Sequence, residues 1–146
     1  MAIDTELHET VKALRSISPV AVGTTGTGQT GKVVDRMGYG GVEFIVDYGT
    51  ITATNATLTP TIKEGDVTGT MTSVADSDLL GTEALAGITA TATRTSGVSK
   101  NVSKRVGYKG KKRYVSCSIK STVTAGTLIS ATALMFNPRS GFPTNP

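Results

Sequence analysis

The sequence contains few of the side chains on which most enzymes depend. Among its 146 residues there is one cysteine, Cys117, one histidine, His8, and no tryptophan. This composition excludes an intramolecular disulfide, a Cys/His zinc site and a Cys–His catalytic pair with a second imidazole to orient it. We therefore expect a protein that is not an enzyme and that binds no metal or cofactor.

Long apolar runs are also missing. No uninterrupted apolar stretch approaches the roughly 20 residues that a membrane-spanning helix needs. The first ten residues contain Asp4, Glu6 and Glu9, which a secretory signal would lack. The sequence thus predicts neither a membrane protein nor a secretory leader, and a chain of this length fits one domain.

Acidic residues are absent from the second part of the chain. All 11 of them lie at or before Glu83, and the stretch that follows carries ten of the 15 Lys and Arg residues. The net charge of +4 therefore hides an acidic first part and a strongly basic second part. This division favours pairing with other copies of the chain or with an acidic partner. Solvated strand faces without a specific partner are the simpler alternative.

What the chain has in abundance is threonine, valine and glycine, a composition typical of β-structure. Turn residues separate short alternating or apolar runs, which predict strands over residues 32–37, 42–48, 51–54, 57–63, 67–74, 88–93, 102–106, 113–123 and 127–136. An insertion with one helical turn is expected over residues 76–86. Because no long helix separates the strands, we predict an all-β fold, a single jelly-roll-like β-sandwich whose body spans residues 32–136.

Two segments are expected to lie outside this body. Residues 4–16 predict a short amphipathic helix with Leu7, Val11 and Leu14 on one face, and residues 22–31 form a Gly/Thr-rich linker. Residues 1–31 are therefore a predicted N-terminal arm, which needs a partner because about three helical turns are marginal alone in water. Residues 137–146 form a proline-rich C-terminal tail.

A six-residue pattern, Arg-x-Gly-Tyr-x-Gly, occurs twice, beginning at Arg36 and at Arg105. Glycine and tyrosine between two strands predict a tight turn, with the rings of Tyr39 and Tyr108 folded over a sheet edge. The functional interpretation is that two matched corners of the sandwich contact neighbouring subunits.

The second copy leads into a basic run, Lys109, Lys111, Lys112 and Arg113. In the alignment of the two copies, Lys112 matches Glu43, which suits complementary pairing between subunits. We expect this hairpin to contact protein. A nucleic-acid-binding module that uses the basic region 100–113 is the alternative, but aromatic residues make up only 5% of the chain and the acidic first part would repel a polyanion.

Two nucleotide-binding patterns overlap but lack their structural context. Residues 26–31 match G-x-G-x-x-G, and residues 26–32 match the first seven positions of a Walker loop, but Val33 follows instead of Ser or Thr. A predicted strand stands where both motifs need a helix, so we do not predict nucleotide binding. Cys117 is expected in the core because it alternates in phase with Val115 and Ile119.

Four segments, in this order, carry a resemblance to a known group: GYGGVEFIV with GTIT in 38–52, DLLGTE in 78–83, VGYKGKKRYV in 106–115 and NPR in 137–139. They resemble small structural proteins of tailed bacteriophages, the capsid decoration (cement) proteins, over about residues 38–139. The resemblance implies a β-sandwich body, a homotrimer, and a position on the outer surface of the virion, bound to the major capsid protein. A head fibre or a head-to-tail connector is the alternative role.

The residues expected to bind the shell or a neighbouring subunit are Leu7, Val11, Leu14, Arg36, Tyr39, Arg105, Tyr108, Lys109, Lys111, Lys112 and Arg113.

Overall fold

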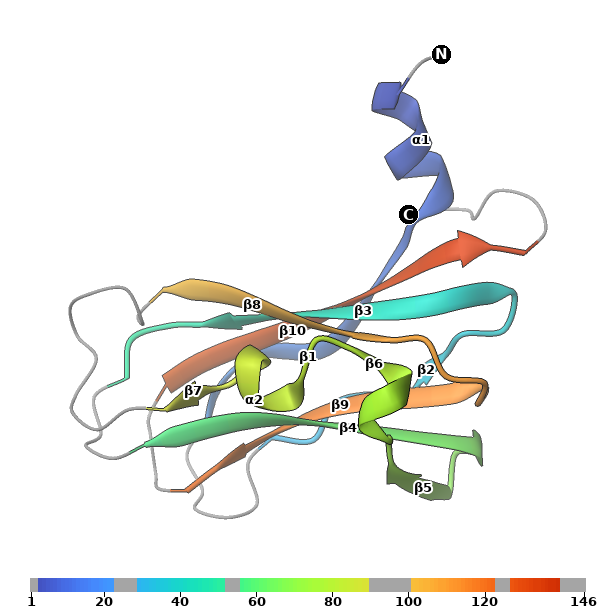
Figure 1. Ribbon diagram of the computed structural model, residues 1–146. Coiled ribbons are helices and arrows are strands. Elements are labelled where there is room, and N and C mark those ends of the chain that lie inside the picture. The colour runs from blue at the N-terminus through green and yellow to red at the C-terminus, as the bar shows by residue number, and fades with distance from the viewer. Residues whose placement is uncertain (1–2, 23–28, 52–55, 90–100, 123–126, 140–146) are drawn as a thin grey trace.

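Alternation of apolar and polar residues along the chain produces two antiparallel sheets that pack face to face (Figure 1). The computed structural model describes residues 3–22, 29–51, 56–89, 101–122 and 127–139, and for residues 3–6 and 89 the backbone alone. The helices are α1 (Ile3–Thr10), the 3-10 turn η1 (Asp76–Asp78) and α2 (Glu83–Ala86). The strands are β1 (Lys12–Val22), β2 (Val34–Asp35), β3 (Tyr39–Tyr48), β4 (Thr57–Val67), β5 (Thr70–Ser73), β6 (Leu79–Leu80), β7 (Ile88–Thr89), β8 (Val102–Tyr108), β9 (Tyr114–Ser121) and β10 (Thr127–Pro138).

The strand order confirms the predicted jelly roll. Sheet A has the order β1-β10-β3-β8-β6, and sheet B has the order β2-β9-β4-β5, with β7 paired to β4. Apart from the short β6 and β7, the pairs are nested: β1 with β10, β2 with β9, β3 with β8 and β4 with β5. The β10–β3 and β9–β4 pairs then roll this nested hairpin into two sheets, which is the jelly-roll arrangement.

The core lies between the two sheets and follows the period of two. In β3 the side chains of Val42, Phe44 and Val46 are fully buried, while Glu43 and Asp47, at alternate positions, face the outside of sheet A. Cys117 of β9 is fully buried, as its phase in the sequence predicts. A chain of this length can bury enough apolar surface between the two sheets to fold without disulfides.

The longer predicted strands are confirmed with shifted ends, and the short ones differ more. β3, β4, β8, β9 and β10 occupy predicted runs, whereas the run 32–37 contains only the two residues of β2 and the run 67–74 contains the four of β5. Parts of three predicted strands, residues 52–54, 90–93 and 123, lie outside the described residues. The predicted helical turn within 76–86 is present as η1 and α2, and the Thr82 hydroxyl caps α2 by accepting the Leu85 N–H.

The prediction for the N-terminal arm is wrong in its second half. The helix ends at Thr10, and β1 begins at Lys12 and pairs with β10. Ile17 and Val22 of β1 are buried in the core, so the body begins at Lys12 and not at residue 32. The hydrogen-bonded ladder to β10 and the burial of one face outweigh the local helical spacing. Pro19 is tolerated because β1 is an edge strand with register shifts.

Residues 29–31 of the predicted linker and 137–139 of the predicted tail belong to the body. Residues 23–28 lie outside the described residues, but Gln29 forms a β-bridge with Ile119, and the Lys32 N–H donates to the Ser16 carbonyl over 2.8 Å. At the other end of the chain, β10 continues to Pro138, which pairs with Tyr39. Residues 140–146 of the predicted tail lie outside the described residues.

Candidate partner-binding end of the sandwich

The two Arg-x-Gly-Tyr-x-Gly segments meet at one end of the sandwich. The first forms the turn between β2 and β3, where Gly38 adopts a φ of +88° that favours glycine. The second ends β8 and opens the connection to β9. The Arg36 N–H donates to the Arg113 carbonyl over 3.0 Å, so the two turns are joined directly. They form one corner together instead of two matched corners.

Arg36 is an internal support of this corner and not a surface residue. Its side chain is buried, with 4% of the residue exposed, and its guanidinium lies over the Tyr108 ring at 5.4 Å from the centroid. It donates to four backbone carbonyls, those of Lys112 (2.5 Å), Gly110 (2.7 Å), Tyr39 (3.0 Å) and Gly40 (3.5 Å). These acceptors satisfy the buried cation and tie both turns to one side chain.

Tyr108 completes the internal network. Its hydroxyl donates to the Glu64 carboxylate of β4 and accepts the Lys112 N–H over 3.0 Å. Burial and the bond to Glu64 raise the pKa of Tyr108 well above its usual range. The ring packs so closely on Gly110 that a Cβ there would overlap it. Tyr108 was predicted to bind a partner, but the structure places it inside the fold.

The basic hairpin presents its cations outward, and two of them are paired with carboxylates of the same chain. Lys112 Nζ lies 2.5 Å from Asp66 Oδ2. The Arg113 guanidinium binds Asp35 at two atoms, over 3.0 and 2.7 Å, and holds the pKa of that carboxyl below its usual range. Lys109 and Lys111 are exposed and have no carboxylate partner among the described residues. Carboxylates of the same chain therefore balance the charges of Lys112 and Arg113.

A basic hollow of about 250 Å³ opens beside this corner. It is lined by Arg36, Met37, Gly38, Tyr39, Lys111, Arg113 and Arg139. Arg139 is positioned there because its N–H donates to the Gly38 carbonyl over 2.8 Å. Met37 at the rim is 70% exposed and offers an apolar contact beside the cations. The hollow therefore offers several cations around an apolar contact, a combination that suits an acidic segment with an apolar side chain.

Arg139 and Met37 were not among the predicted binding residues. Arg139 was assigned to the tail, and Met37 is an ordinary residue within a turn. One indication in the sequence pointed to each: Met37 lies within the first Arg-x-Gly-Tyr-x-Gly pattern, and Arg139 lies within the NPR segment of the resemblance. Their proximity depends on the pairing of the end of β10 with the start of β3.

Arg105 and the predicted pairing of Glu43 with Lys112 lie elsewhere. Arg105 points outward from sheet A, its side chain 81% exposed, with Nε 3.8 Å from Glu43. Glu43 pairs across the strands with Gly107, so it does not face Lys112. Burial raises the pKa of Glu43, and Arg105 opposes that shift only in part. The predicted equivalence of the two copies is therefore wrong, because one arginine is buried and the other exposed.

The three apolar residues of the predicted helical stripe are separated. Leu7 lies on α1 and is 71% exposed. Val11 connects α1 to β1 and is half-buried. Leu14 lies in β1 and packs against the core. Only Leu7 is thus available on the arm to a partner, and α1 stands off the body in Figure 1.

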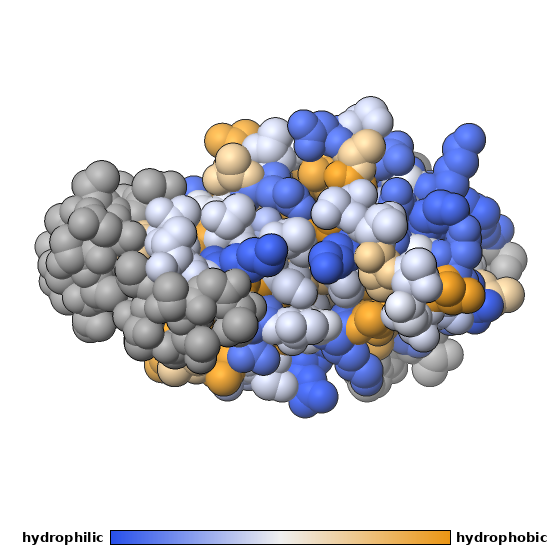
Figure 2. Space-filling model, turned by 90° about the horizontal axis from the view of Figure 1, so that it is seen from below, coloured by the Kyte–Doolittle hydropathy of each residue, from blue (hydrophilic) through white to orange (hydrophobic). Residues whose placement is uncertain are grey.

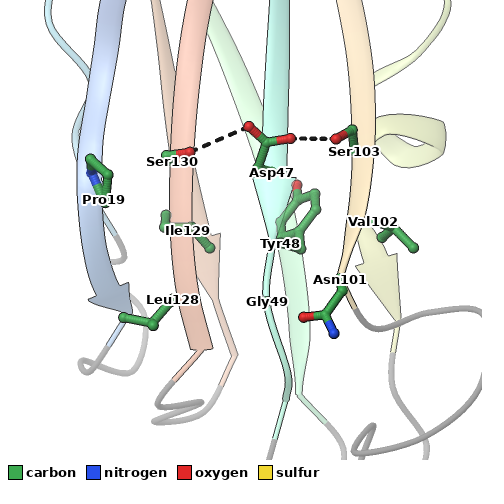
Figure 3. A pocket seen from close by; sticks show the side chains of 10 residues that line it. All are labelled: Pro19, Asp47, Tyr48, Gly49, Asn101, Val102, Ser103, Leu128, Ile129 and Ser130. Atoms are coloured by element: carbon green, nitrogen blue, oxygen red, sulfur yellow. Dashed lines mark hydrogen bonds between the residues drawn. The ribbon is translucent and has the colours of Figure 1, made fainter.

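A second hollow, of about 350 Å³, lies on the outer face of sheet A towards the opposite end (Figure 3). Asp47 of β3 stands between two hydroxyl groups at this site. The Ser103 hydroxyl of β8 donates to one carboxylate oxygen, and the Ser130 hydroxyl of β10 donates to the other over 3.4 Å. Leu128 at its edge is 64% exposed. The three polar groups satisfy one another and cross-link three strands.

The outer face of sheet B is mainly hydrophilic, as Figure 2 shows from below. Thr59 and Thr61 of β4 face this side, next to Lys120 and Ser118 of β9. Apolar residues are scattered across it and do not form a continuous patch in this view. This face is therefore a suitable place for control substitutions that change charge away from the basic hollow.

No protein-family model, curated protein or solved structure matches the chain. In the described part of the chain, no helix has the length and apolarity to cross a membrane. Within the same ranges, no group of three or more His, Cys, Asp or Glu side chains is placed to hold a metal ion.

Proposed function

We propose that this protein is a non-enzymatic structural protein of a tailed-bacteriophage virion, a capsid decoration (cement) protein. It binds the major capsid protein from the outer surface of the shell and assembles as a homotrimer. The end of the sandwich that carries Lys109 and the basic hollow makes the contacts with protein partners.

The observation that carries this proposal is the convergence of the segments that resemble the decoration proteins. Gly38, Asp78, Lys109 and Arg139 come from four segments separated along the sequence. At one end of the sandwich, the Arg139 N–H donates to the Gly38 carbonyl, and the Lys109 N–H donates to the Asp78 carbonyl over 2.9 Å. These hydrogen bonds therefore join the four segments in two pairs at that end of the sandwich. The jelly roll agrees with the proposal, since viral capsid proteins use it, but lectins and cupins do so too.

The nucleic-acid alternative is less well supported by the arrangement of the basic region. A binder of single strands needs exposed rings on which bases stack. Tyr108 is fully buried, Tyr114 is half-buried with the Arg113 guanidinium 5.0 Å from its ring centroid, and Arg105 lies on the outer face of sheet A. Among the described residues of this region, Arg105 therefore lies apart from Lys112 and Arg113, which are at the corner of the sandwich.

The proposal is tested by sedimentation with shells of the major capsid protein encoded in the same genome. The purified chain is expected to sediment with the shells in a saturable, stoichiometric amount. Lys109→Glu should weaken this binding about tenfold, because one attraction becomes a repulsion, while Lys120→Glu on the outer face of sheet B should not. A chain that stays at the top of the gradient at every ratio contradicts the proposal.

Two further measurements separate the alternatives. Binding to the portal or to tail components, without binding to shells, would assign the chain to the connector or fibre role. A salt-dependent affinity for DNA tighter than the roughly micromolar non-specific level, lost in Lys109→Glu, would favour the nucleic-acid module.

A further inference from the structure

We propose that α1 of one copy docks in the basic hollow of a neighbouring copy, so that the chain associates head to tail. The inference deepens the proposed self-association by naming both halves of the contact. It does not depend on the shell, because both surfaces belong to this chain.

The charges of the two surfaces are complementary. The sequence of α1, IDTELHET, contains three acidic residues and no Lys or Arg. The hollow is lined by Lys111, Arg113 and Arg139 and by no acidic residue, although Arg113 is already paired with Asp35 beside it. Among the described residues, Lys111 and Arg139 have no carboxylate partner. An acidic helix is therefore the kind of segment that this hollow attracts.

Each surface also exposes one large apolar side chain. Leu7 on α1 is 71% exposed, and Met37 at the rim of the hollow is 70% exposed. Methionine adapts its shape to an incoming apolar group, so a contact between Leu7 and Met37 would remove both from water. With this contact in place, the cations of the hollow would remain available to the exposed Glu9 of the docked helix.

The helix does not fill the hollow of its own chain. In Figure 1, α1 rises on the side of sheet A, whereas Lys111 and Arg113 belong to the turn that leads into β9 of sheet B. Leu7 and Glu9 are exposed in this arrangement. A helix of eight residues is marginal alone in water, so docking on a neighbour would also stabilise its helical conformation.

A contact between two different surfaces repeats from copy to copy and closes into a ring when the rotation allows it. Such a ring is compatible with the proposed trimer. The exposed edge of sheet A is less suited to the role, because β1 carries Pro19 and two register shifts that interrupt strand addition.

The test measures the mass of the full-length chain by light scattering and sedimentation, without shells. The unchanged chain is expected to be an oligomer that weakens with salt. Lys111→Glu combined with Arg139→Glu disables the hollow, and Leu7→Ser combined with Glu9→Lys disables the helix. Each variant should weaken self-association at least about tenfold. Lys63→Glu combined with Lys120→Glu makes the same charge change elsewhere and should have no effect.

Mixing the two disabled variants gives the decisive result. The first keeps an intact helix and the second an intact hollow, so a mixture should form a one-to-one dimer that does not grow further. Circular dichroism establishes that each variant is folded. A monomeric unchanged chain, an equal effect of the control variant, or a mixture that stays monomeric would each overturn the proposal.

Discussion

The buried guanidinium of Arg36 makes the largest number of connections of any side chain at the corner of the sandwich. Its hydrogen bonds reach four carbonyls on two turns. Arg36→Ala leaves these acceptors without their donor and should lower the free energy of unfolding by about 3 kcal/mol or more. Denaturant unfolding followed by circular dichroism measures the change.

Arg105 is the matched control, because it occupies the same position in the second copy of the sequence pattern. Its side chain is 81% exposed, and its ion pair with Glu43 spans 3.8 Å. Arg105→Ala should therefore change the free energy of unfolding by less than about 0.5 kcal/mol. Equal losses in the two variants would mean that Arg36 does not hold the corner as described.

Cys117 should be unreactive in the folded protein. The side chain is fully buried among apolar neighbours, and burial raises the pKa of its thiol to about 12. The thiolate is the nucleophile, so at pH 8 it is both scarce and inaccessible. A chromogenic disulfide reagent should release colour from the native chain only at the rate of unfolding, and at once in guanidinium chloride. Rapid labelling of the native chain would contradict this position.

The difference between the two arginines also shows where sequence reasoning at single positions reaches its limit. The pattern made Arg36 and Arg105 equivalent. What separates them is the pairing of β2 with β9, which brings carbonyls some 74 to 76 positions away to the guanidinium of Arg36. The burial of Cys117 could be predicted, because it follows from alternation with Val115 and Ile119, two positions away on either side.

Among the elements, the segment 29–32 is held against sheet B by a very close approach. A Cβ on Gly31 would overlap the carbonyl oxygen of Cys117 in β9. Gly31→Ala must displace backbone and should destabilise the fold by about 1 to 3 kcal/mol. Gly69, in the turn between β4 and β5, has open space around its Cβ position, so Gly69→Ala should be nearly neutral. Thermal unfolding of the two variants provides the comparison.

Strands in which buried and exposed residues alternate could be predicted from the sequence. The segment whose apolar residues also fit the helical period could not. Burial alternates from Val42 to Tyr48 in β3 and from Thr127 to Phe136 in β10. In the segment that became α1 and β1, the spacing of Leu7, Val11 and Leu14 fits a helix, although Ile17 and Val22 fit a strand. The partner strand β10, more than 100 positions away, decides between them, and a local pattern contains no information about it.

For the whole molecule, the boundary of the folded body predicts how truncation acts. Removing residues 1–10 takes away α1, which stands off the body, and should change the free energy of unfolding by less than about 1 kcal/mol. Removing residues 1–22 also takes away β1, and with it the buried Ile17 and Val22. Their burial alone is worth roughly 3 to 6 kcal/mol, a large part of the 5 to 15 kcal/mol that is typical of a domain.

The longer truncation should therefore yield a chain that is largely unfolded or aggregated, as size-exclusion chromatography and circular dichroism would show. A cooperative unfolding transition of unchanged midpoint after removal of residues 1–22 would mean that β1 is dispensable. The shorter truncation serves as the control, because it also tests whether α1 contributes to the stability of a single copy.

The nested pairing of strands has a consequence for the timing of synthesis. β10 lies between β1 and β3 in sheet A, so β1 has no strand to pair with until residues 127–138 have left the ribosome. Contacts so distant in sequence also make folding slow, on the scale of milliseconds to seconds. A nascent chain stalled before residue 127 should remain sensitive to protease, and resistance should arise only once β10 is available. We therefore expect no part of the sandwich to form a stable unit before this strand is made.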